Sequence, residues 1–307
     1  RLILEAMKIL VATEKPFASV AVKKMREVSE QAGHVMNLLE NYGNISDLKA
    51  AVADADALIV RSDLVTAEVL DAAPKLKIVV RAGAGYDNID IATCTARNIV
   101  VMNTPGQNSN AVAELAFMMM LYQARSGFSG RTGTELRGKT LGLQAFGFVG
   151  KCMAEIAKGF SMETFAFDPF VNDEIMLSAG VKPVKSVTEL YSTCRYVSIH
   201  IPATEKTRKS IGYNLISRLP ENGVLVNTAR KEVIDEDGLI RAFEERKDII
   251  YLADVEPDCS AVFKEKFPGR YIFTAKKMGA QTEEANINAG IAAAKQVVDY
   301  FLTGNAK

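Results

Sequence analysis

The sequence lacks three features: an excess of charge of one sign, long apolar runs, and closely spaced cysteine pairs. Each absence argues against a class of protein. The 37 basic and 37 acidic residues balance to a formal net charge of +0. A general nucleic-acid binder needs an excess of clustered basic side chains to contact phosphates. The balanced charge therefore argues against general nucleic-acid binding and leaves room only for a local cationic pocket. No apolar run approaches the ~18–20 residues that span a bilayer.

Histidine and cysteine are also few. Of the 2 histidines, we interpret His34 as a structural residue, and His200 ends an expected strand with nothing around it that marks a base. The 4 cysteines have no CxxC spacing, and in a chain this long we expect free thiols rather than a disulfide framework or a metal site. They are Cys94, Cys152, Cys194 and Cys259.

What the sequence does contain is typical of a two-domain cytoplasmic protein. Its 307 residues suggest two domains, at ~150 residues each. Hydrophobic residues make up 48% and charged residues 24%, which supports a real core. The segment before Met7 is too short for a signal peptide, and Met7-Lys8-Ile9-Leu10-Val11 is typical of a natural start.

Short apolar runs alternate with amphipathic segments of helical length. Such β-branched runs are typical of parallel strands covered on both faces, and the alternation indicates right-handed βαβ units. The runs form two series, so we predict an α/β fold of two doubly wound parallel-sheet domains, Rossmann or flavodoxin-like, with a cleft between them. The expected strands are residues 8–12, 57–60, 77–80 and 99–102, then 140–145, 163–167, 196–199, 223–226 and 249–253.

Helices are expected at 18–32 and 45–53, and two longer ones follow. Residues 108–123 form a strongly apolar helix with a methionine run at 118–120, which is typical of core or domain-interface packing. Residues 283–302 form an alanine-rich last helix. No repeat, low-complexity tract or Pro-rich linker marks a domain boundary.

Residues 140–151 indicate a dinucleotide site, because a strand there runs into a helix start. The stretch nearly matches G-x-G-x-x-G, with Ala145 in place of the first glycine. Gly147 would let the backbone approach a pyrophosphate at the helix N-terminus, and Gly150 would let the helix pack on the strand. Asp168 ends the next strand, where its carboxylate would bind ribose hydroxyls and favour NAD over NADP. We expect NAD binding to survive the alanine.

Two cationic positions follow buried strands in the second series. Arg230, in Asn227-Thr228-Ala229-Arg230, would project from the carboxyl end of a strand, where open α/β sheets bind ligands. Its guanidinium would suit a carboxylate and polarise a carbonyl. Lys277 follows a strand exit at Phe273. Desolvation beside Arg230 would lower its pKa and let it accept a hydroxyl proton, although spacing alone favours a solvated basic pair.

Several long motifs, in order, resemble the D-2-hydroxyacid dehydrogenase family over nearly the whole chain after Met7. Within that family the likeness is to members that act on a phosphorylated three-carbon hydroxy acid, and among these to a short subset with Lys in place of the catalytic His. The motifs are VRS at 60–62, VRAGAGYDNID at 80–90, NTPGQN at 103–108, LRGKTLG at 136–142 and NTAR at 227–230.

The resemblance implies a split architecture. A substrate-binding domain would comprise residues 1–104 and 284–307, and an NAD-binding Rossmann domain, residues 105–283, would be inserted between them. It also implies a homodimer with the helix at 108–123 near its interface. Because the chain ends at Lys307, no C-terminal serine-sensing domain is expected.

The resemblance also implies roles for individual residues. The family's Arg, Glu and His match Arg230, Glu256 in a shortened Asp-Val-Glu-Pro stretch, and Lys277, with Glu256 orienting Lys277. The implied NAD-binding residues are Gly147, Phe148, Val149, Gly150, Asp168, Ile201, Thr228, Arg230, Asp254 and Gly279. The implied substrate-binding residues are Arg61, Ser62, Arg81, Ala82, Gly83, Asn108 and Lys277, with Arg61 and Arg81 as cations for a phosphate and backbone N–H groups of the 81–85 loop for a carboxylate.

The implied activity is the reversible, NAD-dependent oxidation of 3-phosphoglycerate to 3-phosphohydroxypyruvate. Two alternatives stay open. One is a reductase of glyoxylate, hydroxypyruvate or a D-lactate-like acid within the same family. The other is a non-catalytic NAD-binding regulator, which the missing histidine and the altered glycine loop would suit. Neither nucleic acid nor membrane is expected as a partner.

Overall fold

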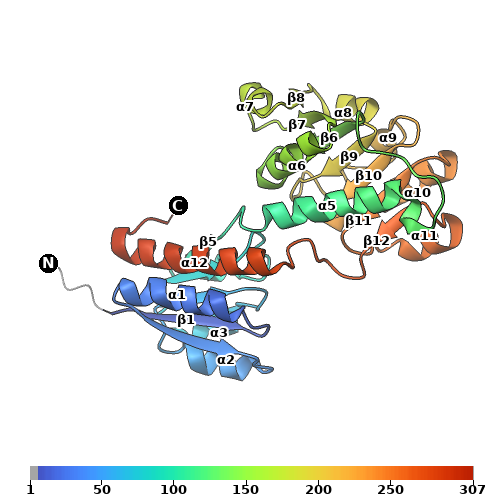
Figure 1. Ribbon diagram of the computed structural model, residues 1–307. Coiled ribbons are helices and arrows are strands. Elements are labelled where there is room, and N and C mark those ends of the chain that lie inside the picture. Colours follow the sequence, from blue (N-terminus) through green and yellow to red (C-terminus); the bar gives the residue numbers. More distant parts are fainter. Residues whose placement is uncertain (1–5, 307) are drawn as a thin grey trace. The chain divides into compact units, whose positions relative to one another are not determined.

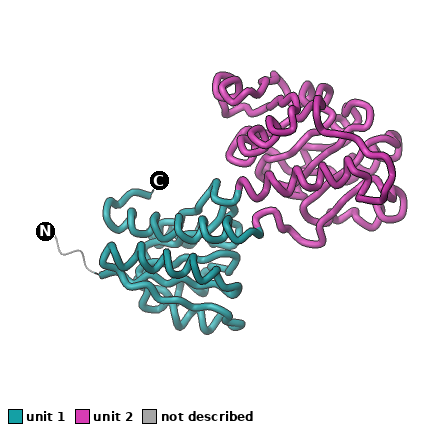
Figure 2. The backbone as a smooth tube through the Cα atoms, in the orientation of Figure 1, with its two compact units in different colours: residues 1–108, 281–307 teal, residues 109–280 magenta. Residues whose placement is uncertain are grey.

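The computed structural model describes residues 6–306, which form two compact α/β units (Figure 1 and Figure 2). Unit 1 takes in the chain up to Asn108 and again from Gln281, and unit 2 is the single segment Ser109–Ala280. The boundaries expected from the sequence fall a few residues outside unit 2 at both ends. Asn108 and Thr282, the N-cap of the last helix, therefore belong to unit 1.

Unit 1 is built on a parallel sheet of five strands in the order β2-β1-β3-β4-β5. The strands are β1 (Lys8–Thr13), β2 (Val35–Glu40), β3 (Ala57–Val60), β4 (Ile78–Arg81) and β5 (Val100–Asn103). The helices are α1 (Ser19–Gln31), α2 (Ile45–Val52), α3 (Ala67–Asp71), α4 (Ile91–Ala96) and α12 (Glu283–Thr303).

Alternating side chains of β1 fill two separate cores, one on each face of this sheet. Ile9 and Val11 pack with side chains of α1 and α12. Leu10 and Ala12 pack with side chains of α2, α3 and α4 on the opposite face (Figure 1). Because successive side chains of a strand point to opposite faces, a strand covered on both sides must be apolar throughout, which explains the continuous run in the sequence.

Unit 2 carries a parallel sheet of seven strands in the order β12-β11-β10-β9-β6-β7-β8. The strands are β6 (Thr140–Gln144), β7 (Glu163–Phe167), β8 (Lys182–Pro183), β9 (Tyr196–Ile199), β10 (Val224–Asn227), β11 (Ile250–Ala253) and β12 (Tyr271–Phe273). The helices are α5 (Ser109–Ala124), η1 (Ser126–Phe128), α6 (Phe148–Gly159), α7 (Asp173–Ser178), α8 (Val187–Thr193), α9 (Tyr213–Ile216), η2 (Lys231–Val233), α10 (Glu236–Glu245) and α11 (Ser260–Lys266).

The strand order reverses at one place in each sheet, between β1 and β3 in unit 1 and between β6 and β9 in unit 2. Open α/β sheets bind ligands outside the carboxyl ends of their strands at such reversals. The fold therefore supplies two places where chemistry is expected, one in each unit.

The predicted fold class, two doubly wound parallel sheets, is confirmed. The structure adds strands β2 and β8, which the sequence pattern does not predict. Both lie at the edge of a sheet. An edge strand is covered less completely, so β2 has a single buried side chain, Met36, among exposed and half-buried ones, and β8 is only two residues long.

The thiols of all four cysteines are free, as expected. None of the helices in residues 6–306 combines the length and the apolar character that crossing a membrane would require.

Candidate active site

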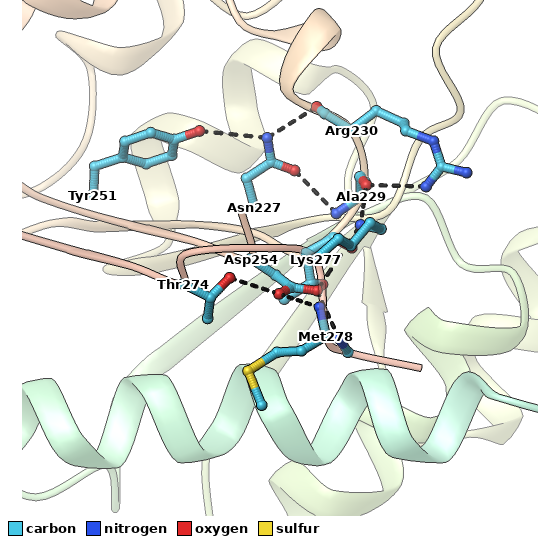
Figure 3. A network of polar contacts seen from close by, with 10 residues as sticks. Asn227, Ala229, Arg230, Tyr251, Asp254, Thr274, Lys277 and Met278 are labelled. Atoms are coloured by element: carbon cyan, nitrogen blue, oxygen red, sulfur yellow. Dashed lines mark hydrogen bonds and ion pairs between the residues drawn. The ribbon is translucent and has the colours of Figure 1, made fainter. Parts of the chain in front are cut away.

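The loops that leave β10 and β12 bring two cationic side chains of unit 2 together (Figure 3). Lys277 follows β12, and its Nζ donates hydrogen bonds to the carbonyls of Thr228 (3.0 Å) and Ala229 (2.5 Å). Arg230 follows β10, and its Nη1 donates to the same Ala229 carbonyl at 3.2 Å. The amine and the guanidinium therefore meet at one acceptor.

Burial and, second to it, the positive charge of Arg230 together lower the pKa of Lys277 to about 8, against the opposing effects of Asp254 and Glu232. The side chain keeps 41% of its surface exposed, so the amine is desolvated but still accessible to a small molecule. A neutral amine has two N–H groups and one lone pair. Because the two carbonyls accept both N–H groups, the lone pair is the position left to take a proton.

Asp254, directly after β11, organises the loop that carries Lys277. Its buried carboxylate accepts hydrogen bonds from Thr274 Oγ1 (2.8 Å), Met278 N (2.9 Å) and Gly279 N (2.8 Å). Its Oδ2 lies 4.0 Å from Lys277 Nζ. A Cβ added at Gly279 would lie 2.9 Å from that oxygen, so a glycine is needed for the loop to close on the carboxylate. Asp254 thereby fixes the position of the amine.

Glu256 does not take the position expected for it. Its carboxylate pairs with Lys264 of α11, and within residues 6–306 the carboxylate that forms an ion pair with Lys277 is that of Asp254. Val255, between the two acids, has a φ of +130°, which is rare for a β-branched residue. The shortened Asp-Val-Glu-Pro stretch turns at this residue, and the Glu256 side chain goes to α11 instead of Lys277.

Asn227, the last residue of β10, shapes the turn that carries Arg230, a role that is not expected from the sequence. Its Nδ2 donates to the Arg230 carbonyl (3.0 Å), and its Oδ1 accepts from Ala229 N (3.0 Å). Figure 3 shows both hydrogen bonds. The Asn227 side chain is buried. The signal in the sequence was a polar residue at the end of an apolar strand.

The turn between β6 and α6 has the backbone of a glycine-rich loop. Ala145 has a φ of +85°, in the region that favours glycine, which is why the dinucleotide pattern has glycine there. A Cβ added at Gly150 would lie 2.6 Å from the Ala145 carbonyl oxygen, whereas one added at Gly147 would meet nothing within 4 Å. Gly150 therefore allows close helix–strand packing, and Gly147 leaves open space at the N-terminus of α6 beside Phe148 and Val149.

Polar groups at the same sheet edge fit a dinucleotide. Each oxygen of Asp168 accepts one backbone hydrogen bond, from Phe146 N (2.8 Å) and Phe170 N (2.9 Å). A carboxylate offers about four lone pairs, so capacity remains for ribose hydroxyls.

Two further polar atoms, Thr228 Oγ1 and His200 Nε2, are buried without a hydrogen-bond partner in the part of the chain that the structure describes. Burial lowers the pKa of His200 to about 3, so its imidazole is neutral. Unpaired buried polar atoms are uncommon, and a ligand at this edge, which Ile201 also adjoins after β9, would give them partners.

The remaining expected substrate-binding residues lie in unit 1. Arg81 Nε donates to the Arg61 carbonyl at 3.0 Å. A Cβ added at Gly83, whose φ is +147°, would lie 1.4 Å from Arg81 Nη1, so the missing side chain leaves room for that guanidinium. Ser62 lines a cavity beside Arg61. Asn108, half-buried, is the last residue of unit 1 before α5.

The family resemblance implies that backbone N–H groups of the 81–85 loop bind a substrate carboxylate, but not all of these groups are available. Ala82 N donates to the Val60 carbonyl (2.8 Å), and Gly83 N donates to the Arg81 carbonyl (2.9 Å). Neither N–H group is therefore available to a substrate carboxylate. Within the described chain, the N–H groups of Ala84 and Gly85 have no such acceptor.

Comparison with known proteins places this arrangement in context. The model of the family "D-isomer specific 2-hydroxyacid dehydrogenase, catalytic domain" matches residues 13–307. A D-3-phosphoglycerate dehydrogenase of Methanocaldococcus jannaschii is 35% identical over 95% of this chain and 57% of its own length. A hydroxypyruvate reductase of Thermotoga maritima is 35% identical over 80% of this chain and 84% of its own length.

Among solved structures, an NAD+-bound 3-phosphoglycerate dehydrogenase of Entamoeba histolytica is 51% identical, with a TM-score of 0.87 and coverage of 98% of this chain and 97% of that one. The chain spans only a little over half the length of the Methanocaldococcus relative, at 57%. The family match nevertheless covers all but the first 12 residues, so it reaches into both units and includes every residue of the candidate site described above. The chain therefore belongs to the D-isomer specific 2-hydroxyacid dehydrogenase family.

Proposed function

We propose that the protein catalyses the reversible, NAD-dependent oxidation of 3-phosphoglycerate to 3-phosphohydroxypyruvate, the first step of serine biosynthesis. The observation that carries the proposal is the Lys277 amine, which has a lowered pKa, both N–H groups of its neutral form engaged, and Arg230 at the same carbonyl. Support for the substrate comes from the relatives, since the 51% identical solved neighbour and the Methanocaldococcus protein are both named for phosphoglycerate.

NAD would be held by the carboxyl edge of the unit 2 sheet. The open space at Gly147 would admit the pyrophosphate beside the α6 N-terminus, and Asp168 would accept bonds from ribose hydroxyls. Thr228 Oγ1 would gain the partner that it lacks. When bound, NAD supplies the acceptor for the hydride that leaves C2 of the hydroxy acid.

The chemistry left to the chain is proton transfer and charge stabilisation. In the oxidative direction the lone pair of neutral Lys277 accepts the C2 hydroxyl proton as the C2–H bond breaks, so the amine becomes an ammonium and the hydroxyl a carbonyl. Arg230 stabilises negative charge on the C2 oxygen. Asp254 keeps Lys277 in place through the loop hydrogen bonds.

The two ends of the substrate would be held by unit 1. The guanidinium of Arg61 and the hydroxyl of Ser62 suit a phosphate. The N–H groups of Ala84 and Gly85 suit the carboxylate, and Gly83 leaves room for the Arg81 guanidinium in the same loop.

A second candidate within the family is reduction of unphosphorylated hydroxypyruvate. The Thermotoga hydroxypyruvate reductase favours it, because this chain covers 84% of that relative at 35% identity. The two candidates differ in whether the phosphate is needed for turnover.

The test is the loss of NADH absorbance with phosphohydroxypyruvate and, separately, with hydroxypyruvate, at pH 7 and pH 9. We expect rapid turnover with the phosphorylated acid alone. Equal rates with both acids would replace the proposal by a general hydroxyacid reductase. No turnover with either, together with measurable NADH binding, would favour a non-catalytic regulator.

A further inference from the structure

A cavity of about 370 Å³ lies within unit 1, at the carboxyl ends of β1, β2 and β3. This is the place where the strand order of the sheet reverses, and a ligand is expected at such a reversal. The residues that line it include two with cationic side chains, Lys15 and Arg61, and the hydroxyl-bearing Ser62. The chemistry of that lining points to an anion.

Arg61 is held rigidly at the edge of this cavity. Its Nη1 donates to the carbonyls of Lys15 (3.3 Å) and Pro16 (3.4 Å), and its Nη2 donates to Asn286 Oδ1 (2.6 Å) on α12. Its guanidinium carbon lies 5.1 Å from the centre of the Phe17 ring. A guanidinium has five N–H groups, and these contacts use three of them, so two remain for a ligand.

Lys15 supplies a second positive charge. Its backbone is anchored, because its carbonyl accepts from Thr13 Oγ1 (2.7 Å) as well as from Arg61. Lys15 is exposed and is one of the residues that line the cavity. No ion pair joins its ammonium to a carboxylate anywhere in residues 6–306.

The acidic side chains of the cavity differ in availability. Asp63 is satisfied internally, since its carboxylate accepts from Glu14 N (2.7 Å), Tyr42 OH (2.7 Å) and Arg61 N (3.3 Å). Glu14 also lines the cavity, and its carboxylate opposes an anion there. The remaining polar groups of Lys15, Arg61 and Ser62 favour binding of an anion.

We propose that Lys15 is a specificity-determining residue that binds the phosphate of the substrate together with Arg61, and that Asn286 is the positioning residue that holds the guanidinium for it. A phosphate monoester carries about −1.5 to −2 charge at pH 7, more than one arginine with two available N–H groups balances. The inference rests on the proposed function and adds to it the residues that distinguish phosphorylated from unphosphorylated acids.

The experiment compares Lys15→Met and Asn286→Leu with the control Lys23→Met, which removes an exposed lysine of α1 outside the cavity. KM is measured for phosphohydroxypyruvate and hydroxypyruvate. We expect Lys15→Met and Asn286→Leu to raise KM about tenfold or more for the phosphorylated acid only, as for loss of a charge-assisted hydrogen bond. Glu14→Gln should lower the same KM. A KM for Lys15→Met equal to that of Lys23→Met, or raised equally for both acids, would overturn the inference.

Failure of the proposed function is separable from failure of this inference. If the wild-type protein does not prefer the phosphorylated acid, the proposed function fails. Calorimetric titration with inorganic phosphate then tests, independently of turnover, whether the cavity binds an anion. Weaker binding by Lys15→Met than by Lys23→Met supports the anion site, and equal binding overturns it.

Discussion

The protonation state of Lys277 links the chemistry of this protein to pH. With a pKa lowered to about 8, the amine is mostly charged at pH 7 and mostly neutral at pH 9. The oxidation of a hydroxy acid needs the neutral form, and the reverse reduction needs the ammonium. In the proposed reaction the same side chain would therefore serve both directions and favour one of them on either side of pH 8.

We expect kcat/KM for oxidation to rise about tenfold per pH unit below pH 8 and to level off above it, as for one base of that pKa. The reduction should show the opposite profile. Lys277→Ala should lower kcat by ~10²–10⁴-fold and abolish the inflection. A loss smaller than tenfold, or an inflection that persists, would contradict the role given to the amine.

The lowered pKa also has a consequence for stability. Between about pH 8 and 10.5 the unfolded chain binds a proton at this lysine that the folded chain does not. The free energy of unfolding therefore rises with pH through that range. Urea unfolding of the wild type and of Lys277→Met should show the wild type gaining stability relative to the variant from pH 8 to pH 10.5. A constant difference across this range would mean that the pKa is not lowered.

Ala145 has a conformation that costs free energy. An L-residue in the left-handed region is disfavoured by ~1–2 kcal/mol, and replacing it with glycine removes this cost. Glycine, however, has greater entropy in the unfolded chain, which offsets ~0.5–1 kcal/mol of the improvement. Ala145→Gly should therefore raise the free energy of unfolding by about 0.5–1 kcal/mol without weakening NADH binding. Lower stability of the variant, measured by denaturant unfolding, would show that contacts of the alanine methyl outweigh the strain.

The site could be predicted unevenly from the sequence. Lys277 and Arg230 follow strands, and parallel strands that share a sheet bring their carboxyl ends together, so their proximity was predictable. The loop-holding role of Asp254 was not, because it depends on hydrogen bonds to residues 274–279 that only the folded loop creates. The displacement of Glu256 was equally hidden, since it follows from the turn at Val255.

The strand–turn–helix from β6 to α6 combines two glycines with different tasks. Gly150 packs against the Ala145 carbonyl, and Gly147 faces open space. We therefore expect a substitution at Gly150 to affect stability and one at Gly147 to affect ligand binding.

Gly150→Ala should lower the free energy of unfolding by ~1–3 kcal/mol, the cost of overpacking, because the new methyl would meet a backbone oxygen at 2.6 Å. Gly147→Ala is the matched control. It should keep the wild-type melting temperature and weaken NADH binding, measured by fluorescence titration. Normal NADH binding by Gly147→Ala would show that the pyrophosphate does not bind at this turn.

The elements themselves were largely predictable where they are buried on both faces. β3 and β10 are buried at every position, and the sequence shows each of them as an apolar run. β2 has a single buried residue, Met36, and the polar Asn37 interrupts its apolar residues at a sheet edge, so it lacks the continuous run. β5 lies at the other edge of the same sheet, and it was predicted because its apolar run is unbroken.

For the chain as a whole, α5 is the element that points to self-association. Its apolar side chains are spread around the helix rather than along one face, and Met118 and Tyr122 are 56% and 39% exposed. Phe128 of η1, 76% exposed, contacts the Tyr122 ring edge-on. A helix that is apolar all round is normally covered on all sides.

The homodimer implied by the family resemblance would cover these side chains. We expect light scattering after size exclusion to give twice the mass of the chain, and the double variant Met118→Glu, Phe128→Ser to give the mass of one chain. A wild-type monomer would refute the expectation, and a variant that stays dimeric would move the interface elsewhere.

Unit 1 is assembled from two segments that unit 2 separates in the sequence, and this affects the order in which the units can fold on the ribosome. Gly290 of α12 packs so closely on α1 that an added Cβ would lie 2.9 Å from the Met25 sulfur. The apolar side chains of Phe17, Ala21 and Met25 share their core with α12. At translation rates of ~5–20 residues per second, making unit 2 takes roughly 10–30 s. Throughout that interval the nascent first unit presents an unfinished core, so unit 2, a single continuous segment, is the part able to fold before α12 emerges.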